Sequence, residues 1–256
     1  LGSEISKRLA STFTESGVLF FTLISICFLL TAMEIGIILL NRFRQVEGIE
    51  KAAGGTSLDA IKNLVSSSQI RSIALYMYLW TTMMTIHWIT SVQIVKAWSD
   101  NEAERIVFFS SIEQSVTILT LFTQFFLTSA IIRLAGPKNI LMLYGFLFIG
   151  VFIGYYLNPS ISYVFAVTVI LRLFEYGINK PTREVVFTYL KRIDRYKSSV
   201  LVETFFVRFG DFSGSIFILL TKSSIAFSHI PMLAIAFAGC LAFLGCKITP
   251  KEKISS

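Results

Sequence analysis

Residues 139–157 read NILMLYGFLFIGVFIGYYL, an apolar run that contains no charged side chain. A helix needs about 20 apolar residues to cross the roughly 30 Å of hydrocarbon in a bilayer. Asn158 and Pro159 follow this run directly, and another apolar run begins at residue 161. Because proline commonly stands where one helix stops and the next starts, the stretch predicts two transmembrane helices joined by a short turn.

The composition of the whole chain agrees with this local pattern. Of the 256 residues, 54% are hydrophobic and only 15% are charged, and the mean hydropathy is +0.69. These values are too apolar for a water-soluble domain. The composition therefore predicts an all-α integral membrane protein that crosses the bilayer several times.

The net charge of +7 does not indicate nucleic-acid binding, because the basic residues form short clusters between apolar runs. Such clusters are typical of loops that face anionic lipid and the cytoplasm. The three cysteines lie inside apolar runs without a CxxC pair, so neither a disulfide framework nor a thiolate metal site is expected.

Seven apolar stretches are long enough to be spans. They cover residues 17–41, 73–95, 106–132, 139–157, 161–179, 200–221 and 230–246. Sixteen Lys and Arg residues lie in one set of alternating loops and five in the other. Since basic loops stay inside, we expect a cytoplasmic C-terminus in a bacterial inner membrane or an organelle inner membrane.

The connection between the first two spans differs from the others, because residues 42–72 form a long polar linker with the amphipathic piece SLDAIKNLVSS. A long linker before six closely spaced spans predicts the second half of a twelve-helix, two-bundle transporter. The seven helices then become the sixth to twelfth. The expected parts are the last helix of an N-terminal bundle (1–43), a cytoplasmic linker (44–72), a six-helix bundle (73–247) and a cytoplasmic tail (248–256).

Ionisable residues are unevenly distributed among the last six spans. Spans 139–157 and 230–246 contain none, whereas the other four contain His87, Glu113, Arg172, Glu175, Glu203, Arg208 and Asp211. Charge in hydrocarbon is retained mainly where it is paired or lines a wet cavity. In a major facilitator-type carrier the seventh, eighth, tenth and eleventh helices face the cavity, and these are the four charged spans.

Two charge pairs have the i,i+3 spacing that places side chains on one helix face. Arg208 and Asp211 lie near the expected membrane midplane, and Arg172 and Glu175 lie further toward the cytoplasm. These pairs contact a substrate in one interpretation and only hold helices in register in the other. His87 is either a proton-coupling group or an interhelical hydrogen-bonding residue.

The aromatic residues near His87 are expected to pack the helix or anchor it at the membrane interface; they are Tyr76, Tyr78, Trp80 and Trp88. Two GxxxG spacings, Gly150 with Gly154 and Gly210 with Gly214, predict close helix contacts. The chain has no phosphate-binding loop, no dinucleotide fingerprint and no HExxH motif, so we expect no enzymatic activity, no cofactor and no metal.

Residues 172–215 read RLFEYGINKPTREVVFTYLKRIDRYKSSVLVETFFVRFGDFSGS. This stretch resembles the nucleotide exchange carriers of the ATP/ADP translocase type and their bacterial relatives. The matching elements are EYG at 175–177, PTRE at 181–184, a basic turn at 191–197 and RFG at 208–210. Asp211 stands where the exchangers proper have a lysine, and Ser198-Ser199 replaces a Lys-Gly or Lys-Asn step.

The resemblance implies an antiporter that works by alternating access without hydrolysis. It implies substrate contacts from the residues Arg172, Lys180, Arg183, Arg208 and Asp211, and gating or salt-bridge roles for Glu113, Glu175, Glu184 and Glu203. The expected partners are the lipid bilayer, an anionic small molecule such as a nucleotide, and an N-terminal bundle from the same chain or a partner subunit.

Two alternatives stay open, and the departure at Asp211 supports both. The same fold could carry another organic anion, or a proton-coupled solute with the help of His87. The chain could instead be a transport-inactive homologue that serves as a membrane subunit of a larger complex.

Overall fold

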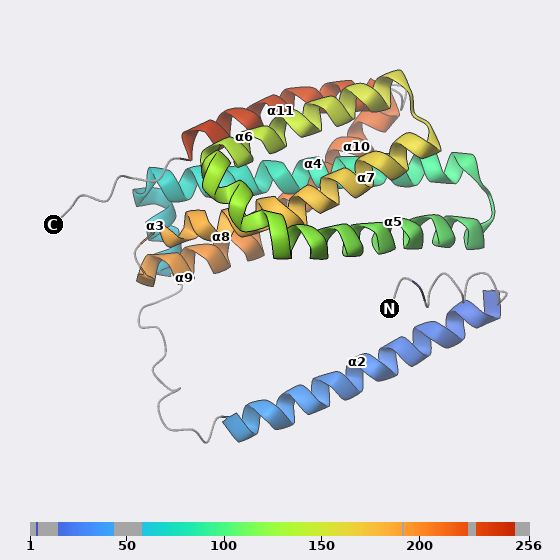
Figure 1. Ribbon diagram of the computed structural model, residues 1–256, viewed down its shortest axis with the longest axis horizontal. Helices are drawn as coiled ribbons and strands as arrows, with labels where there is room; N and C mark the ends of the chain where they lie inside the picture. Colours follow the sequence, from blue (N-terminus) through green and yellow to red (C-terminus); the bar gives the residue numbers. More distant parts are fainter. Residues whose placement is uncertain (1–3, 5–14, 44–57, 191, 225–228, 249–256) are drawn as a thin grey trace. The chain divides into compact units, whose positions relative to one another are not determined.

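The computed structural model describes residues 4, 15–43, 58–190, 192–224 and 229–248 (Figure 1). These residues are almost entirely helical and include no strand, which confirms the predicted all-α class for this part of the chain. About half of the predicted linker, residues 44–57, and most of the predicted tail, residues 249–256, lie outside the described residues.

The chain divides into two compact units, one with residues 1–56 and 101–111 and one with residues 57–100 and 112–256. In the first unit, helix α2 (Glu15–Phe43) covers the predicted span 17–41. Its apolar side chains from Ile24 to Leu40 are exposed, and Phe28 is the most exposed of them at 75%. A helix that is apolar on all sides requires lipid or another protein around it.

The second unit is a helical bundle that begins with the amphipathic piece of the linker, now helix α3, packed against α9. Its elements are α3 (Leu58–Ser66), α4 (Ser68–Trp98), the larger part of α5 (Glu102–Phe122), η1 (Thr123–Leu127), α6 (Thr128–Leu157), α7 (Ile161–Phe174), η2 (Glu175–Asn179), α8 (Lys180–Thr188), α9 (Arg192–Leu201), η3 (Val202–Phe206), α10 (Val207–Ser224) and α11 (Ile230–Lys247).

Four helical segments among the described residues are long and apolar enough to cross a membrane; they are Glu102–Leu157, Ile161–Thr188, Lys197–Lys222 and Ile230–Lys247. They contain five of the seven predicted spans. Helix α4 is not among these four segments, and the apolar part of α2, Ile24–Leu40, is shorter than they are.

The first of these segments has 56 residues and is interrupted once. At 1.5 Å per residue it would extend roughly 84 Å, far more than one bilayer crossing requires. Gly136, which lies between the predicted spans 106–132 and 139–157, has φ of 74° and ψ of 152°, a conformation that residues with a Cβ rarely adopt. The ribbon turns back within α6 (Figure 1), so the predicted break between 132 and 139 is confirmed.

The segment from Ile161 to Thr188 remains helical past the predicted end at residue 179. Pro181 does not end the helix; it lies in the first turn of α8, directly after the π-helical segment η2. Proline has no N–H, so a backbone carbonyl one turn before Pro181 lacks its usual helical donor. Side chains from η1 and α6 donate to the carbonyls of this turn instead. The hydroxyl of Thr128 donates to the Gly177 carbonyl at 2.5 Å, and the Gln124 amide donates to the Tyr176 carbonyl at 2.9 Å.

Glycines permit the closest helix contacts in the bundle. A Cβ on Gly214 of α10 would lie 2.9 Å from the Thr82 carbonyl oxygen of α4, so the close approach predicted for 210 and 214 is confirmed. Gly150, by contrast, has open space around it. The contact between α6 and α11, at Gly245 and Met142, was not predicted.

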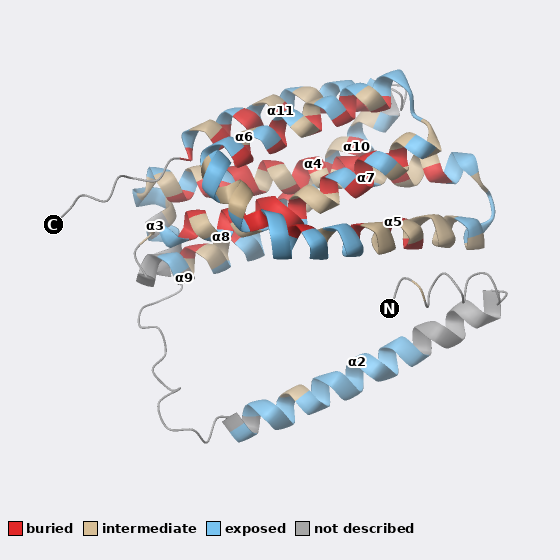
Figure 2. Cartoon of the chain, in the orientation of Figure 1, coloured by how far each residue is buried: buried red, intermediate tan, exposed pale blue. Residues whose placement is uncertain are grey.

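Helix α4 forms the centre of the bundle, because it packs against α3, α7, α10, α11 and η3. Figure 2 shows buried positions concentrated along α4 and α7. Fully buried side chains of α4 include Met83 and Ile86, and Tyr144 and Phe148 of α6 are buried to the same degree. Polar side chains of α4, such as Thr82 and His87, are therefore buried inside the unit.

Candidate functional site: ion pairs around helix α4

The most deeply buried charges form a cluster between η2, α8 and α4. The Glu175 carboxylate accepts hydrogen bonds from Arg183 Nη2 and from Asn179 Nδ2, both at 2.7 Å. The Arg183 guanidinium lies 4.1 Å from the centre of the Trp80 ring, and the Tyr76 hydroxyl lies 3.4 Å from Asn179 Oδ1. Only 4% of the Glu175 side chain and 10% of the Arg183 side chain are exposed. The pair is therefore closed to solvent in this conformation.

A second ion pair links α7 to α5 through Arg172 and Glu113. The Arg172 guanidinium also lies 5.4 Å from the centre of the Trp88 ring of α4. Glu113 is nearly half exposed, whereas Arg172 is mostly covered. This pair therefore lies at the boundary between the bundle interior and its surface.

The third pair, Arg208 with Asp211, remains open. Arg208 Nη1 lies 3.5 Å from Asp211 Oδ2, and the Thr85 hydroxyl of α4 donates to Asp211 Oδ1 at 2.9 Å. The Arg208 side chain is 80% exposed and the Asp211 side chain 44%. Both residues lie within Lys197–Lys222, one of the four segments that are apolar enough to span a membrane. The predicted i,i+3 pairing of these two residues is confirmed.

His87 is buried, and both of its ring nitrogens lie within hydrogen-bond distance of hydroxyl groups. Its Nδ1 lies 3.0 Å from the Tyr155 hydroxyl, and its Nε2 lies 3.3 Å from the Thr168 hydroxyl. Ser91 lies 2.8 Å from the Tyr155 hydroxyl and donates to the His87 carbonyl. Neutral imidazole has one donor and one acceptor, and this set of hydroxyl groups satisfies both. The arrangement favours the interhelical hydrogen-bonding interpretation of His87, and its role in proton coupling stays a prediction.

The other predicted site residues lie at the surface of the bundle. Lys180, Glu184 and Glu203 are all exposed, the first two on α8 and the third in η3. The structure does not bring them into the three ion pairs described above. Their predicted roles in substrate contact and gating stay predictions.

One predicted pairing is wrong. Arg172 and Glu175 were expected to pair with each other, but Arg172 pairs with Glu113 and Glu175 pairs with Arg183. Arg183 lies beyond the predicted end of its span at residue 179, but it is buried, and the helix continues past it to Thr188.

Sequence reasoning also missed part of the site on α4. Trp80 and Trp88 were expected only to pack or to anchor the helix. Trp80 lies against Arg183 of α8, and Trp88 lies against Arg172 of α7. Thr85 was not singled out at all. The sequence of α4 contains no local signal that identifies either contact.

Within the described residues, no group of three or more His, Cys, Asp or Glu side chains is placed to hold a metal ion. No protein-family model, no curated protein and no solved structure matches this chain. The arrangement of charges is therefore the basis for an assignment of function. Two ion pairs are covered or partly covered and one is open, and all three contact the same central helix.

Proposed function

We propose that this chain is part of a major facilitator-type membrane carrier that resembles the ATP/ADP exchange carriers and works by alternating access. The observation that supports this most is the open Arg208–Asp211 pair within a helical segment that is long and apolar enough to span a membrane. An exposed charge at membrane depth is costly in lipid, so it must face water or another protein. A water-filled cavity between two helix bundles provides that environment.

In this proposal Arg208 binds the anionic substrate. A guanidinium offers several N–H donors in a fixed fork, which suits carboxylate and phosphate oxygens. Asp211 and Thr85 hold Arg208 near α4 until the substrate competes for it. The proposed substrate is a nucleotide, and the lysine that the exchange carriers have in place of Asp211 would be replaced in part by Arg172. Arg172 contacts Trp88 of α4, the helix whose Thr85 bonds to Asp211.

The covered pairs have a different role in the proposal. Alternating access requires two states whose free energies differ by only a few kcal/mol. Pairs such as Glu175–Arg183 and Glu113–Arg172 stabilise one state and must exchange partners in the other. The exposed apolar side chains of η3 and α10, among them Phe205, Phe212 and Leu219, would pack against the second bundle.

The test is exchange transport by the full-length protein in proteoliposomes loaded with ADP. We expect uptake of labelled ATP by the wild type and a loss of about tenfold or more in Arg208→Ala, since a hydrogen bond to a charged group contributes roughly 1.5–3 kcal/mol. Arg208→Lys should retain partial activity. Arg105→Ala, which removes an i,i+3 pair with the exposed Glu102, is the control and should transport normally. Unchanged uptake in Arg208→Ala would refute the site.

A further inference from the structure

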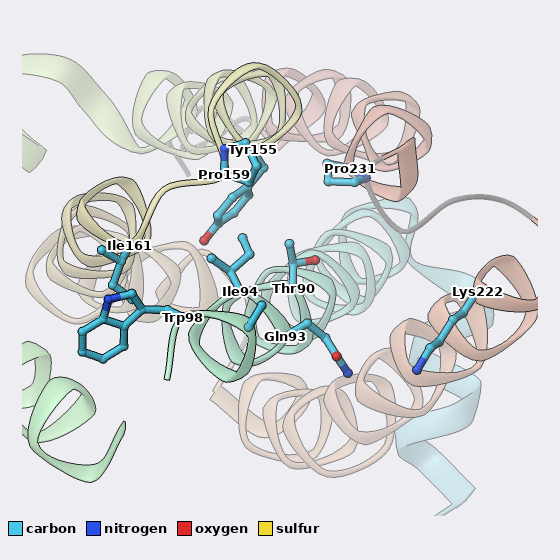
Figure 3. A pocket seen from close by; sticks show the side chains of 10 residues that line it. Thr90, Gln93, Ile94, Trp98, Tyr155, Pro159, Ile161, Lys222 and Pro231 are labelled. Atoms are coloured by element: carbon cyan, nitrogen blue, oxygen red, sulfur yellow. The ribbon is translucent and has the colours of Figure 1, made fainter. Parts of the chain in front are cut away.

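A cavity of about 590 Å³ lies in the second unit, apart from the three ion pairs (Figure 3). It is located where several helices begin or end, near Trp98 at the end of α4, Ile161 at the start of α7, Lys222 in the last turn of α10 and Pro231 in the first turn of α11. Its volume falls within the range of small-molecule binding sites, about 300–1,000 Å³.

Most of the cavity wall is apolar, with Ile94, Trp98 and Ile161 among the lining residues. A few polar groups interrupt it, namely Thr90, Gln93, Tyr155 and Lys222. Figure 3 shows Thr90 between Tyr155 and Gln93, and the ends of the Gln93 and Lys222 side chains on the same side of the view. A mainly apolar wall with a few convergent polar groups is typical of a ligand site.

Thr90 gives the most direct indication of a missing ligand. The residue is 1% exposed, and its hydroxyl has no hydrogen-bond partner among the described residues. Other hydroxyl residues of α4 donate to a backbone carbonyl four residues earlier, as Thr82 does to Tyr78 and Ser91 to His87. A buried hydroxyl without a partner is destabilising, so its retention at the cavity requires another reason.

We propose that this cavity binds an organic monoanion with an apolar body. The ammonium group of Lys222 attracts the carboxylate, the Thr90 hydroxyl and the Gln93 amide donate hydrogen bonds to it, and Trp98 contacts the apolar body. The Tyr155 hydroxyl already bonds to Ser91 and His87, so only its ring contacts the ligand.

The charge of the site selects against nucleotides. A polyphosphate requires several Arg or Lys donors, and the described residues that line this cavity include one lysine and no arginine. The site is therefore distinct from the one around Arg208, and it does not depend on the transport proposal. A fatty acid from the bilayer and a water-soluble aromatic carboxylate share the required chemistry.

The experiment measures binding to the full-length protein in phosphatidylcholine nanodiscs. Radiolabelled dodecanoate represents the bilayer source and radiolabelled benzoate the aqueous source, each in scintillation proximity assays. We expect saturable binding of at least one of them, with dodecanol and dodecyltrimethylammonium unable to compete. Saturable binding of neither anion, or equal competition by dodecanol, would overturn the proposal.

Two variants test the residues. Lys222→Gln should weaken binding roughly threefold to fivefold, because an exposed charge contributes modestly, and Thr90→Val should weaken it about tenfold. Lys96→Gln is the matched control, since Lys96 is an exposed lysine of the last turn of α4 that does not line the cavity. It should bind like the wild type.

Stability separates a binding role of Thr90 from a structural one. Removal of an unpartnered buried hydroxyl by the isosteric valine should leave the melting temperature of the unliganded protein unchanged or raise it. Weaker binding together with undiminished stability supports the proposal. Affinities equal to that of the wild type in both Lys222→Gln and Thr90→Val would overturn it.

Discussion

The buried pair of Glu175 and Arg183 should be strongly coupled in a double-mutant cycle. Glu175→Gln leaves the Arg183 charge buried without a counter-ion, and Arg183→Met leaves the carboxylate in the same position. Removal of one partner from a buried pair costs about 3–5 kcal/mol, whereas replacement of both by neutral side chains is often close to neutral. Each single variant should therefore be much less stable than the double variant.

The expected change in melting temperature is large enough to measure directly. A loss of 1 kcal/mol lowers the melting temperature of a chain of this size by about 2–4 °C, so each single variant should melt roughly 10 °C lower. The double variant should recover at least about half of that decrease, although the methionine that replaces Arg183 makes none of the hydrogen bonds of a guanidinium. Size-exclusion chromatography of heated samples in detergent follows the fraction that remains folded.

An exposed pair in the same chain serves as the control. Glu102 and Arg105 lie 3.5 Å apart, and 73% of the Glu102 side chain is exposed. Such a pair contributes less than about 1 kcal/mol, so Glu102→Gln should melt within a few degrees of the wild type. The reasoning is refuted if Glu175→Gln and Arg183→Met melt with the wild type, or if their decreases simply add in the double variant.

Two further predictions concern the contacts between helices. Gly214→Ala places a Cβ 2.9 Å from the Thr82 carbonyl and should destabilise the protein by about 1–3 kcal/mol, whereas Gly150→Ala, in open space, should not; melting temperatures in detergent distinguish them. Thr128→Val removes the donor to the Gly177 carbonyl and should cost about 1–3 kcal/mol, whereas Thr128→Ser keeps the hydroxyl and should cost less; equal losses for valine and serine would contradict the hydrogen-bond explanation.

The helices themselves could largely be predicted from the sequence. Apolar runs of span length predicted where most of the helices lie, because burial in lipid or protein requires continuous apolar stretches. The turn at Gly136 could also be recognised, because a glycine followed by proline disfavours a continuous helix.

The ion pairs could be predicted only where the helix is regular. Arg208 and Asp211 belong to the α-helix α10, so the rule that residues three apart are neighbours holds for them. Glu175 and Arg183 are eight residues apart, a spacing that does not align side chains in an ordinary α-helix. One wide π turn and one α turn together take about eight residues, so η2 brings them to the same face.

Contacts between helices were the least predictable part of the site. Trp80 and Trp88 lie against arginines that are more than 80 residues away in the sequence. Nothing in the local pattern of α4 specifies which neighbouring helix it meets. The partner of each charge depends on how the helices pack, and that arrangement is a property of the whole bundle.

The π-helical segments η1, η2 and η3 also affect how this chain should be aligned with any related sequence. A π turn amounts to one additional residue inside a helix, accommodated without a loop. A relative in which residues 175–179 form an ordinary turn would be one residue shorter there. The correct alignment would then place a single-residue gap in the middle of a helix, and a gap moved to the nearest loop would pair Arg183 with the wrong position.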